Sequence, residues 1–314
     1  MIKKSLTVML MLMWFSLPVE AISKYSGTSN FQFLKIPPSA RAVGLGEAYT
    51  AVSDDLEALI YNPAGLAQLT REQMSTTYLQ WLKDIWCGYF NYGKPLPQKG
   101  TIAASIFYLT AIDIEKRGED KSLLGNLSVN NGVATVGFGR ELSEKILGGA
   151  SVKIAFESYD NKGWTAGAID LGLLLRFYPR FNVGISLLNL SFFGTNLPFG
   201  QRLGLAYQVH RKVRFAMDLY GYRDSGLRFG GGLEYKYNRN LSLRLGYKGF
   251  EDNLGRVEAK VLESIGMDEV PGLSLGVGIL TTQGLKGHAM KFDYGFVPYG
   301  RLGMTHHFSL GFEF

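Results

Sequence analysis

The sequence predicts an all-β protein: a transmembrane antiparallel β-barrel of about fourteen strands, with an N-terminal plug segment that contains short helices. Three observations support this fold class. The N-terminus is typical of exported proteins, apolar and polar residues alternate through most of the chain, and the last predicted strand ends on phenylalanine. Together they divide the chain into a signal peptide (1–21), a plug segment (22–70) and an outer-membrane barrel (71–314).

The first residues predict a cleaved signal peptide. Lys3 and Lys4 precede an apolar stretch over residues 6–17, and Ala21 provides the small residue that cleavage needs. A membrane anchor is the alternative, but the apolar stretch is too short to span a bilayer comfortably. We therefore expect export to the outer membrane of a Gram-negative-type bacterium.

Within the plug segment, residues 24–70 do not alternate, and they predict short helices joined by turns. Ser39 is a possible helix cap after Pro37 and Pro38. Asp54, Asp55 and Glu57 could form a calcium site or an acid/base pair, but they fit helix capping and anchoring of the plug better, because the spacing lacks the pattern of a calcium loop. The residues of this plug motif are Gly44, Gly46, Asp54, Asp55, Asn62, Pro63, Ala64 and Gly65.

From about residue 75 onward the dominant period is two. Leu241, Leu243 and Leu245, for example, alternate with Ser242 and Arg244. Successive side chains of a strand point to opposite faces, so each segment has one apolar and one polar face. A soluble sandwich would give the same pattern. However, segments of about nine to eleven residues can cross a membrane when tilted, and aromatic residues gather near their ends.

Counting such segments gives an even number of strands, as bacterial single-chain barrels have. The predicted strands are 75–82, 86–93, 100–109, 132–140, 148–158, 166–177, 181–190, 200–209, 213–222, 227–237, 241–250, 271–280, 287–297 and 305–314. With both termini periplasmic, the short links fall on the periplasmic side. The longest links, Thr110–Asn131 and Glu251–Val270, are then extracellular loops.

Charged residues on the presumed inward faces are expected to line the lumen. They are Lys153, Arg176, Arg202, Arg214, Asp218, Glu234, Arg244, Lys291 and Asp293. Because both signs occur, pairing across the lumen that closes the polar interior is the favoured interpretation. A charged path for solutes is the alternative.

The last strand carries a pattern of its own. Phe308, Leu310, Phe312 and Phe314 alternate with smaller or polar residues, and the chain stops on Phe314. Such an ending resembles the C-terminal sorting signal that the outer-membrane assembly machinery recognises. That machinery is therefore an expected partner.

Two blocks resemble a known family. Ala40–Ala48, with Ala51–Asp55 and Tyr61–Leu66, resembles the N-terminal block of the PorV/PorQ family, which belongs with the FadL-like outer-membrane barrels. Phe292–Gly300 is similar to that family's C-terminal block. The resemblance implies a fourteen-strand barrel whose N-terminal segment folds into or against the lumen, with residues 62–64 near the periplasmic mouth. Glu47 departs from the family pattern.

The resemblance implies two classes of function. The first is a non-catalytic accessory of transport or protein secretion across the outer membrane, as PorV-like proteins are in type IX secretion. The alternative is a FadL-like channel for small hydrophobic solutes. The expected partners are the lipid bilayer and lipopolysaccharide, together with an exported protein or a hydrophobic small molecule.

Other functions lack sequence support. The single Cys87 excludes an intrachain disulfide and a cysteine-based metal cluster. The net charge is +6, but the basic residues are scattered, which argues against nucleic acid as a partner. His306 and His307 point to opposite faces of a strand and cannot share a metal. No hydrolase or dinucleotide motif occurs, so we expect no enzyme, no cofactor and no metal.

Overall fold

The computed structural model describes residues 27–82, 85–117, 119–120, 122–160, 162–178, 180–194, 196–249, 272–281, 288–299 and 303–314. The predicted signal peptide (1–21) and the second predicted long loop (251–270) lie outside these residues. In the part of the chain that is described, no helix is both long enough and apolar enough to cross a membrane.

Four short helices precede fourteen strands. The helices are η1 (Gln32–Lys35), α2 (Ala40–Val43), α3 (Ala58–Tyr61) and η2 (Pro63–Gln68). The strands are β1 (Gln73–Gln80), β2 (Trp86–Leu96), β3 (Gly100–Arg117), β4 (Leu123–Ser143), β5 (Ile146–Tyr159), β6 (Lys162–Tyr178), β7 (Phe181–Phe193), β8 (Gly200–His210), β9 (Val213–Tyr222), β10 (Ser225–Lys236), β11 (Leu241–Lys248), β12 (Leu273–Thr281), β13 (Ala289–Pro298) and β14 (Met304–Glu313).

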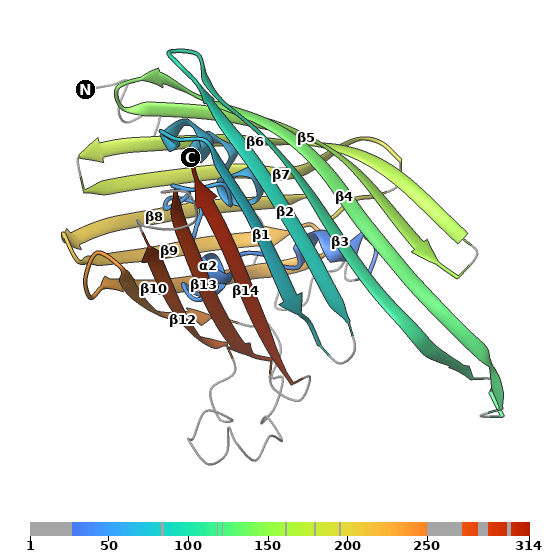
Figure 1. The fold of residues 1–314 in the computed structure, drawn as a ribbon. Coiled ribbons are helices and arrows are strands. Elements are labelled where there is room, and N and C mark those ends of the chain that lie inside the picture. Colours follow the sequence, from blue (N-terminus) through green and yellow to red (C-terminus); the bar gives the residue numbers. More distant parts are fainter. Residues whose placement is uncertain are drawn as a thin grey trace.

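The strands form a closed antiparallel barrel, which confirms the predicted fold class. Each strand pairs with its neighbour in the chain, and β1 pairs with β14, where Tyr78 lies opposite Phe308. Figure 1 shows the strands wrapping around the helices. We call the end at which β1 begins and β14 ends the proximal end, and the opposite end the distal end.

Side chains alternate between the two faces of the wall, as the period of two predicts. In β3, Ile102 and Ile106 are 44% and 60% exposed, whereas Ala103 and Phe107 are 2% and 5% exposed. Exposed Val, Leu, Ile and Phe residues recur on the outer face of the other strands. An outer face of this composition suits lipid.

The predicted loop Thr110–Asn131 is wrong. β3 continues to Arg117 and β4 begins at Leu123, so this stretch is mostly a hairpin that extends beyond the neighbouring strands (Figure 1). The register shifts between Ala111 and Ile114, but the two strands remain paired beyond this shift, where Ile114 lies opposite Leu127. The bulge interrupts the alternation, which explains why the pattern predicted a loop.

Residues 29–70, which precede β1, are largely buried inside the barrel. We call residues 29–70 the inner segment. Its helix α2 contacts β12, β13 and β14, whereas η2 contacts β3 to β6 on the other side of the closed sheet. Glycines on the wall allow the close approach: a Cβ atom on Gly149 would lie 2.3 Å from the Pro63 carbonyl. One on Gly172 would lie 2.2 Å from the Asn62 side-chain oxygen.

The inner face of the barrel has two chemically different sides. The apolar wall lies on β2 to β6 and consists of Tyr89, Phe107, Leu109, Val133, Ala155, Ala166 and Ala168. The charged wall lies on β8 to β13 and consists of Arg202, Arg214, Asp218, Glu234, Arg244, Lys291 and Asp293. The inner faces of β2 to β6 are therefore more apolar than expected, although they also carry buried polar and charged residues, among them Lys153 and Asp170.

Candidate functional site

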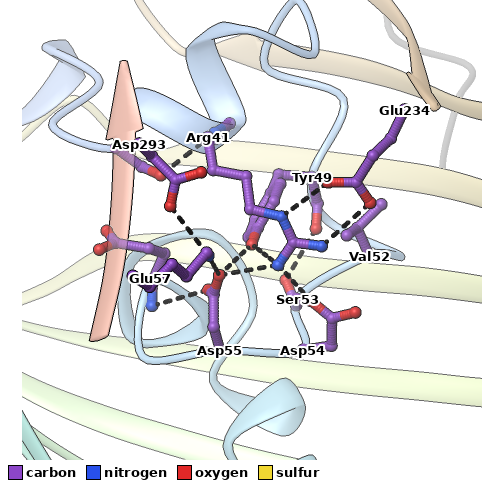
Figure 2. A network of polar contacts seen from close by, with 12 residues as sticks. Arg41, Tyr49, Val52, Ser53, Asp54, Asp55, Glu57, Glu234 and Asp293 are labelled. Carbon is purple, nitrogen blue, oxygen red and sulfur yellow. Dashed lines mark hydrogen bonds and ion pairs between the residues drawn. The ribbon is translucent and has the colours of Figure 1, made fainter. Parts of the chain in front are cut away.

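Arg41 is the centre of the contacts between the inner segment and the charged wall (Figure 2). Ser39 caps α2, the helix that carries Arg41, by accepting a hydrogen bond from Ala42 N at 3.1 Å. The Arg41 guanidinium donates two hydrogen bonds to Glu234, at 3.1 and 3.2 Å. It also donates to Asp54 at 2.6 Å and to Asp55 at 2.8 Å. Arg41 is only 8% exposed, so these charges are largely shielded from water.

The network continues along the wall. Arg214 pairs with Asp54 at 2.8 Å. Arg244 forms two ion pairs, one with Glu234 at 2.9 Å and one with Asp293 at 2.6 Å. Lys291 contacts Asp293 at 3.0 Å and Asp55 at 3.4 Å. With Arg41, the network contains as many cations as carboxylates. Each buried charge therefore has a partner, as burial requires.

Asp218 holds the next part of the inner segment. Its carboxylate accepts hydrogen bonds from the backbone N–H of Tyr49 at 3.2 Å and of Thr50 at 3.0 Å. Arg202 pairs with the same carboxylate at 3.1 Å and donates to the Glu47 carbonyl at 2.7 Å. The Glu47 carboxylate pairs with Lys248 on β11. Glu47 itself adopts a positive φ of 61°.

Of the plug motif, the structure brings Asn62, Pro63 and Ala64 onto the wall at β5 and β6. The Asn62 side chain accepts from Ala64 N at 3.2 Å and donates to Leu173 O at 3.1 Å. Gly65 packs so closely that a Cβ atom would lie 2.1 Å from Ser53 O. Gly44 and Gly46 lie against β10 to β12, where a Cβ on Gly46 would lie 2.4 Å from Tyr247 O.

Two further predicted lumen charges lie apart from both the Arg41 network and the Asp218 contacts. Lys153 pairs with Asp170 at 2.7 Å inside the wall, and it also donates to Asn189 at 3.1 Å. Arg176 donates to Gln68 of the inner segment at 3.3 Å. Most of the predicted lumen charges thus contact the inner segment or a neighbouring strand, and they do not line one continuous path.

Two carboxyl groups of the inner segment have shifted pKa values. Burial and, to a smaller extent, the Asp55 carboxylate raise the pKa of Glu57 to about 8. One Glu57 carboxylate oxygen has no hydrogen-bond partner among the described residues. Burial also opposes ionisation of Asp54, but Arg41 and Arg214 outweigh it and hold the Asp54 pKa below its ordinary value.

A mainly apolar cavity of about 440 Å³ lies at the distal end. It lies between the inner segment, the distal parts of β3 to β5, and the β1–β2 link. Its apolar lining consists of Phe33, Ile36, Pro37, Trp81, Ile85, Leu109, Ala111, Ile114, Val129 and Tyr299. Polar side chains, Lys35 and Arg228 among them, line one side. Ile114 and Tyr159 are also 39% and 43% exposed, so the cavity opens at the distal surface.

A second cavity, of about 490 Å³, lies at the proximal end. Its lining is charged and includes Arg41, Asp55, Glu234, Arg244 and Lys291. The two cavities have no lining residue in common. They lie on opposite sides of the inner segment, because its residues 32–37 line the distal cavity and residues 39–57 the proximal one.

The sequence did not single out Arg41 or Tyr49 as site residues, and it gave Glu57 only a capping or anchoring role. An arginine among the small residues of a short helix is the local signal for Arg41. Its partner Glu234 is 193 positions away, so no local pattern links the two residues.

The predicted C-terminal residues lie on the outer face of β14. Phe308 and Phe314 are 38% and 49% exposed, and Leu310 and Phe312 are partly exposed. Their neighbours His307 and Ser309 are buried inside. Among the described residues, no group of three or more His, Cys, Asp and Glu side chains could hold a metal ion.

Comparisons with known proteins are consistent with this architecture. A family model described as the uncharacterised protein family UPF0164 matches residues 18–170. No curated protein matches the sequence. The toluene transporter TbuX of Ralstonia pickettii matches with a TM-score of 0.61 and 13% identity, over 90% of this chain and 98% of that one.

Two further barrels match at similar levels. The CymD monoaromatic hydrocarbon channel gives a TM-score of 0.56 and 12% identity, over 90% of this chain and 98% of that one. A FadL homologue of Pseudomonas aeruginosa gives a TM-score of 0.55 and 11% identity, over 87% and 97%. The chain therefore has the fold of the FadL-like barrels, which the resemblance implied, whereas the finer PorV/PorQ kinship has no match among these comparisons.

Proposed function

We propose that the protein is an outer-membrane channel that takes up small hydrophobic solutes, with no catalytic step. The observation that carries this proposal is the distal cavity, whose lining is mainly apolar and aromatic. The inner segment lies directly beneath it and acts as a plug, so a solute must bind before it passes. Structures of the same fold described as toluene and hydrocarbon transporters support the proposal.

Cavity filling tests this function. Ala111 lines the cavity and is 4% exposed. Ala104 lies on the outer face of the same strand. We expect saturable binding of toluene to the purified protein, loss of that binding in Ala111→Trp, and unchanged binding in Ala104→Trp. Absence of saturable binding in the unmodified protein, or equal binding by both variants, would reject the proposal.

A secretion accessory of the PorV type is the second candidate, and one observation favours it. The β3–β4 hairpin extends beyond the neighbouring strands and exposes Leu123 and Leu124 at 61% and 60% (Figure 1). An extended apolar tip suits a protein partner better than a solute. Deleting residues 116–125, which removes the tip but keeps Ile114 of the cavity lining, should then reduce export of specific proteins and leave toluene binding intact. The channel proposal predicts no change in the exported proteins.

A further inference from the structure

Exposed basic residues surround the proximal end of the barrel. Among the described residues, they occur at each of five proximal links: β2–β3, β4–β5, β6–β7, β8–β9 and β10–β11. We call six of them the basic ring: Lys99, Arg140, Lys145, Arg180, Arg211 and Arg239. Lys212, also exposed in the β8–β9 link, donates to the Tyr237 carbonyl at 3.0 Å and is not counted. The exposed acidic residues in the same links are Glu141 and Glu144, both between β4 and β5. The ring therefore has a net positive charge.

The ring lacks counter-ions within the described chain. None of its six side chains forms an ion pair with another described residue. Exposed cations at the distal end behave differently: Lys116 pairs with Asp160 at 3.6 Å, and Arg117 pairs with Glu115 at 2.6 Å. These two cations of the β3–β4 hairpin are neutralised locally, whereas the six proximal cations remain available to an anionic partner.

The ring lies just beyond the outer apolar surface. Arg140 follows Phe138 by two positions and Arg239 follows Tyr237 by two, so each pair spans roughly 7 Å along the chain. Phe138 and Tyr237 are 38% and 57% exposed. Exposed aromatic side chains mark the boundary between hydrocarbon and headgroups. Cations at this distance from the boundary lie at the depth of lipid phosphates.

We propose that the basic ring binds the phosphate groups of anionic phospholipids in the membrane leaflet at the proximal end. A guanidinium forms paired hydrogen bonds to phosphate oxygens, and four of the six ring residues are arginines. Clustered basic residues at a membrane surface attract anionic lipids. The proximal leaflet is the periplasmic one in the predicted topology, so the protein recognises phospholipid on that side of the membrane.

Competition between two lipids tests the proposal. Delipidated protein in neutral detergent is mixed with equal amounts of phosphatidylglycerol and phosphatidylcholine that have the same acyl chains. Native mass spectrometry then counts the lipids that remain bound. We expect about a tenfold preference for phosphatidylglycerol, which weakens as salt is raised. The variant Arg180→Gln/Arg211→Gln/Arg239→Gln should reduce this preference to within about twofold.

The distal variant Lys116→Gln/Arg117→Gln/Lys162→Gln is the matched control and should keep the full preference. A faster-migrating band on unboiled gels shows that each variant has folded. Equal retention of the two lipids by the unmodified protein would overturn the proposal. So would an unchanged preference in the proximal variant, or an equal loss in the distal variant.

Discussion

The apolar wall and the charged wall bind the same inner segment by different physical means. On the apolar wall, Phe33 stacks on Phe107 with ring centroids 6.1 Å apart and an interplanar angle of 6°. On the charged wall, Arg41 is held by three carboxylates. The free energy of apolar packing changes little when one atom moves, whereas removing one partner of a buried ion pair leaves an uncompensated buried charge. The charged wall therefore fixes the position of the segment, and the apolar wall supplies buried area.

The largest effect should come from breaking the charged wall. Arg41→Ala leaves Glu234, Asp54 and Asp55 with too little positive charge in a buried site. We expect a loss of about 3–5 kcal/mol in the free energy of unfolding. Thermal unfolding in detergent measures it, and Arg239→Ala, on the exposed proximal link, is the control. Equal melting temperatures for the two variants would contradict the role assigned to Arg41.

A matched change on the apolar side should lower the free energy of unfolding by a smaller amount. Leu59 is fully buried, and its side chain packs against Gly137 of β4. Leu59→Ala removes this packing and leaves a cavity, so we expect a loss of about 3 kcal/mol. Repeating the thermal measurement at several salt concentrations sharpens the comparison. A strong salt dependence of the Leu59→Ala effect would show that the two sides are not chemically separate.

Glu57 should make the stability depend on pH. Its pKa is raised to about 8, so the folded state holds a proton that the unfolded chain releases near its ordinary pKa. The free energy of unfolding should therefore fall as pH rises through this window, by roughly 2 kcal/mol between pH 6 and pH 8. Glu57→Gln should remove the dependence. An identical pH profile for the variant and the unmodified protein would refute the assignment.

The smallest effect should come from crowding the wall under Pro63. Gly149→Ala places a methyl group against the Pro63 carbonyl, and we expect a loss of about 1–2 kcal/mol. Gly88→Ala is the control, because a Cβ atom there meets nothing within 4 Å. Denaturant midpoints compare the two variants. Stability losses of the same size would show that the inner segment can shift away from the wall.

The sequence was sufficient to predict the barrel and its strand number. The alternation of Leu243 and Leu245 with Arg244 contains the required information, because the period of two is a local property of each strand. The apolar wall was not predicted. Ile106 and Phe107 are both apolar, although one faces outward and the other inward. Alternation identifies an inner face only where that face is polar.

The site was less predictable than the fold. Individual charges such as Glu234 and Asp293 were expected to point inward, but the sequence pattern did not show which charged residue each one would pair with. Arg41 was missed as a site residue, because its contacts depend on the closure of the barrel. The distal cavity is also a tertiary feature, formed by residues from several strands, a link and the inner segment.

The separation of 193 residues between Arg41 and Glu234 also constrains the order of assembly. The inner segment is synthesised before every strand, yet its ion-pair partners lie on β9, β10, β11 and β13 and in the β9–β10 link. Contacts between distant parts of a chain form slowly, because the intervening loop must first be closed. The segment therefore emerges first and docks late. Until β10 is in place, Arg41 remains hydrated, and any factor that escorts the unfolded chain must protect a segment that has no partner yet.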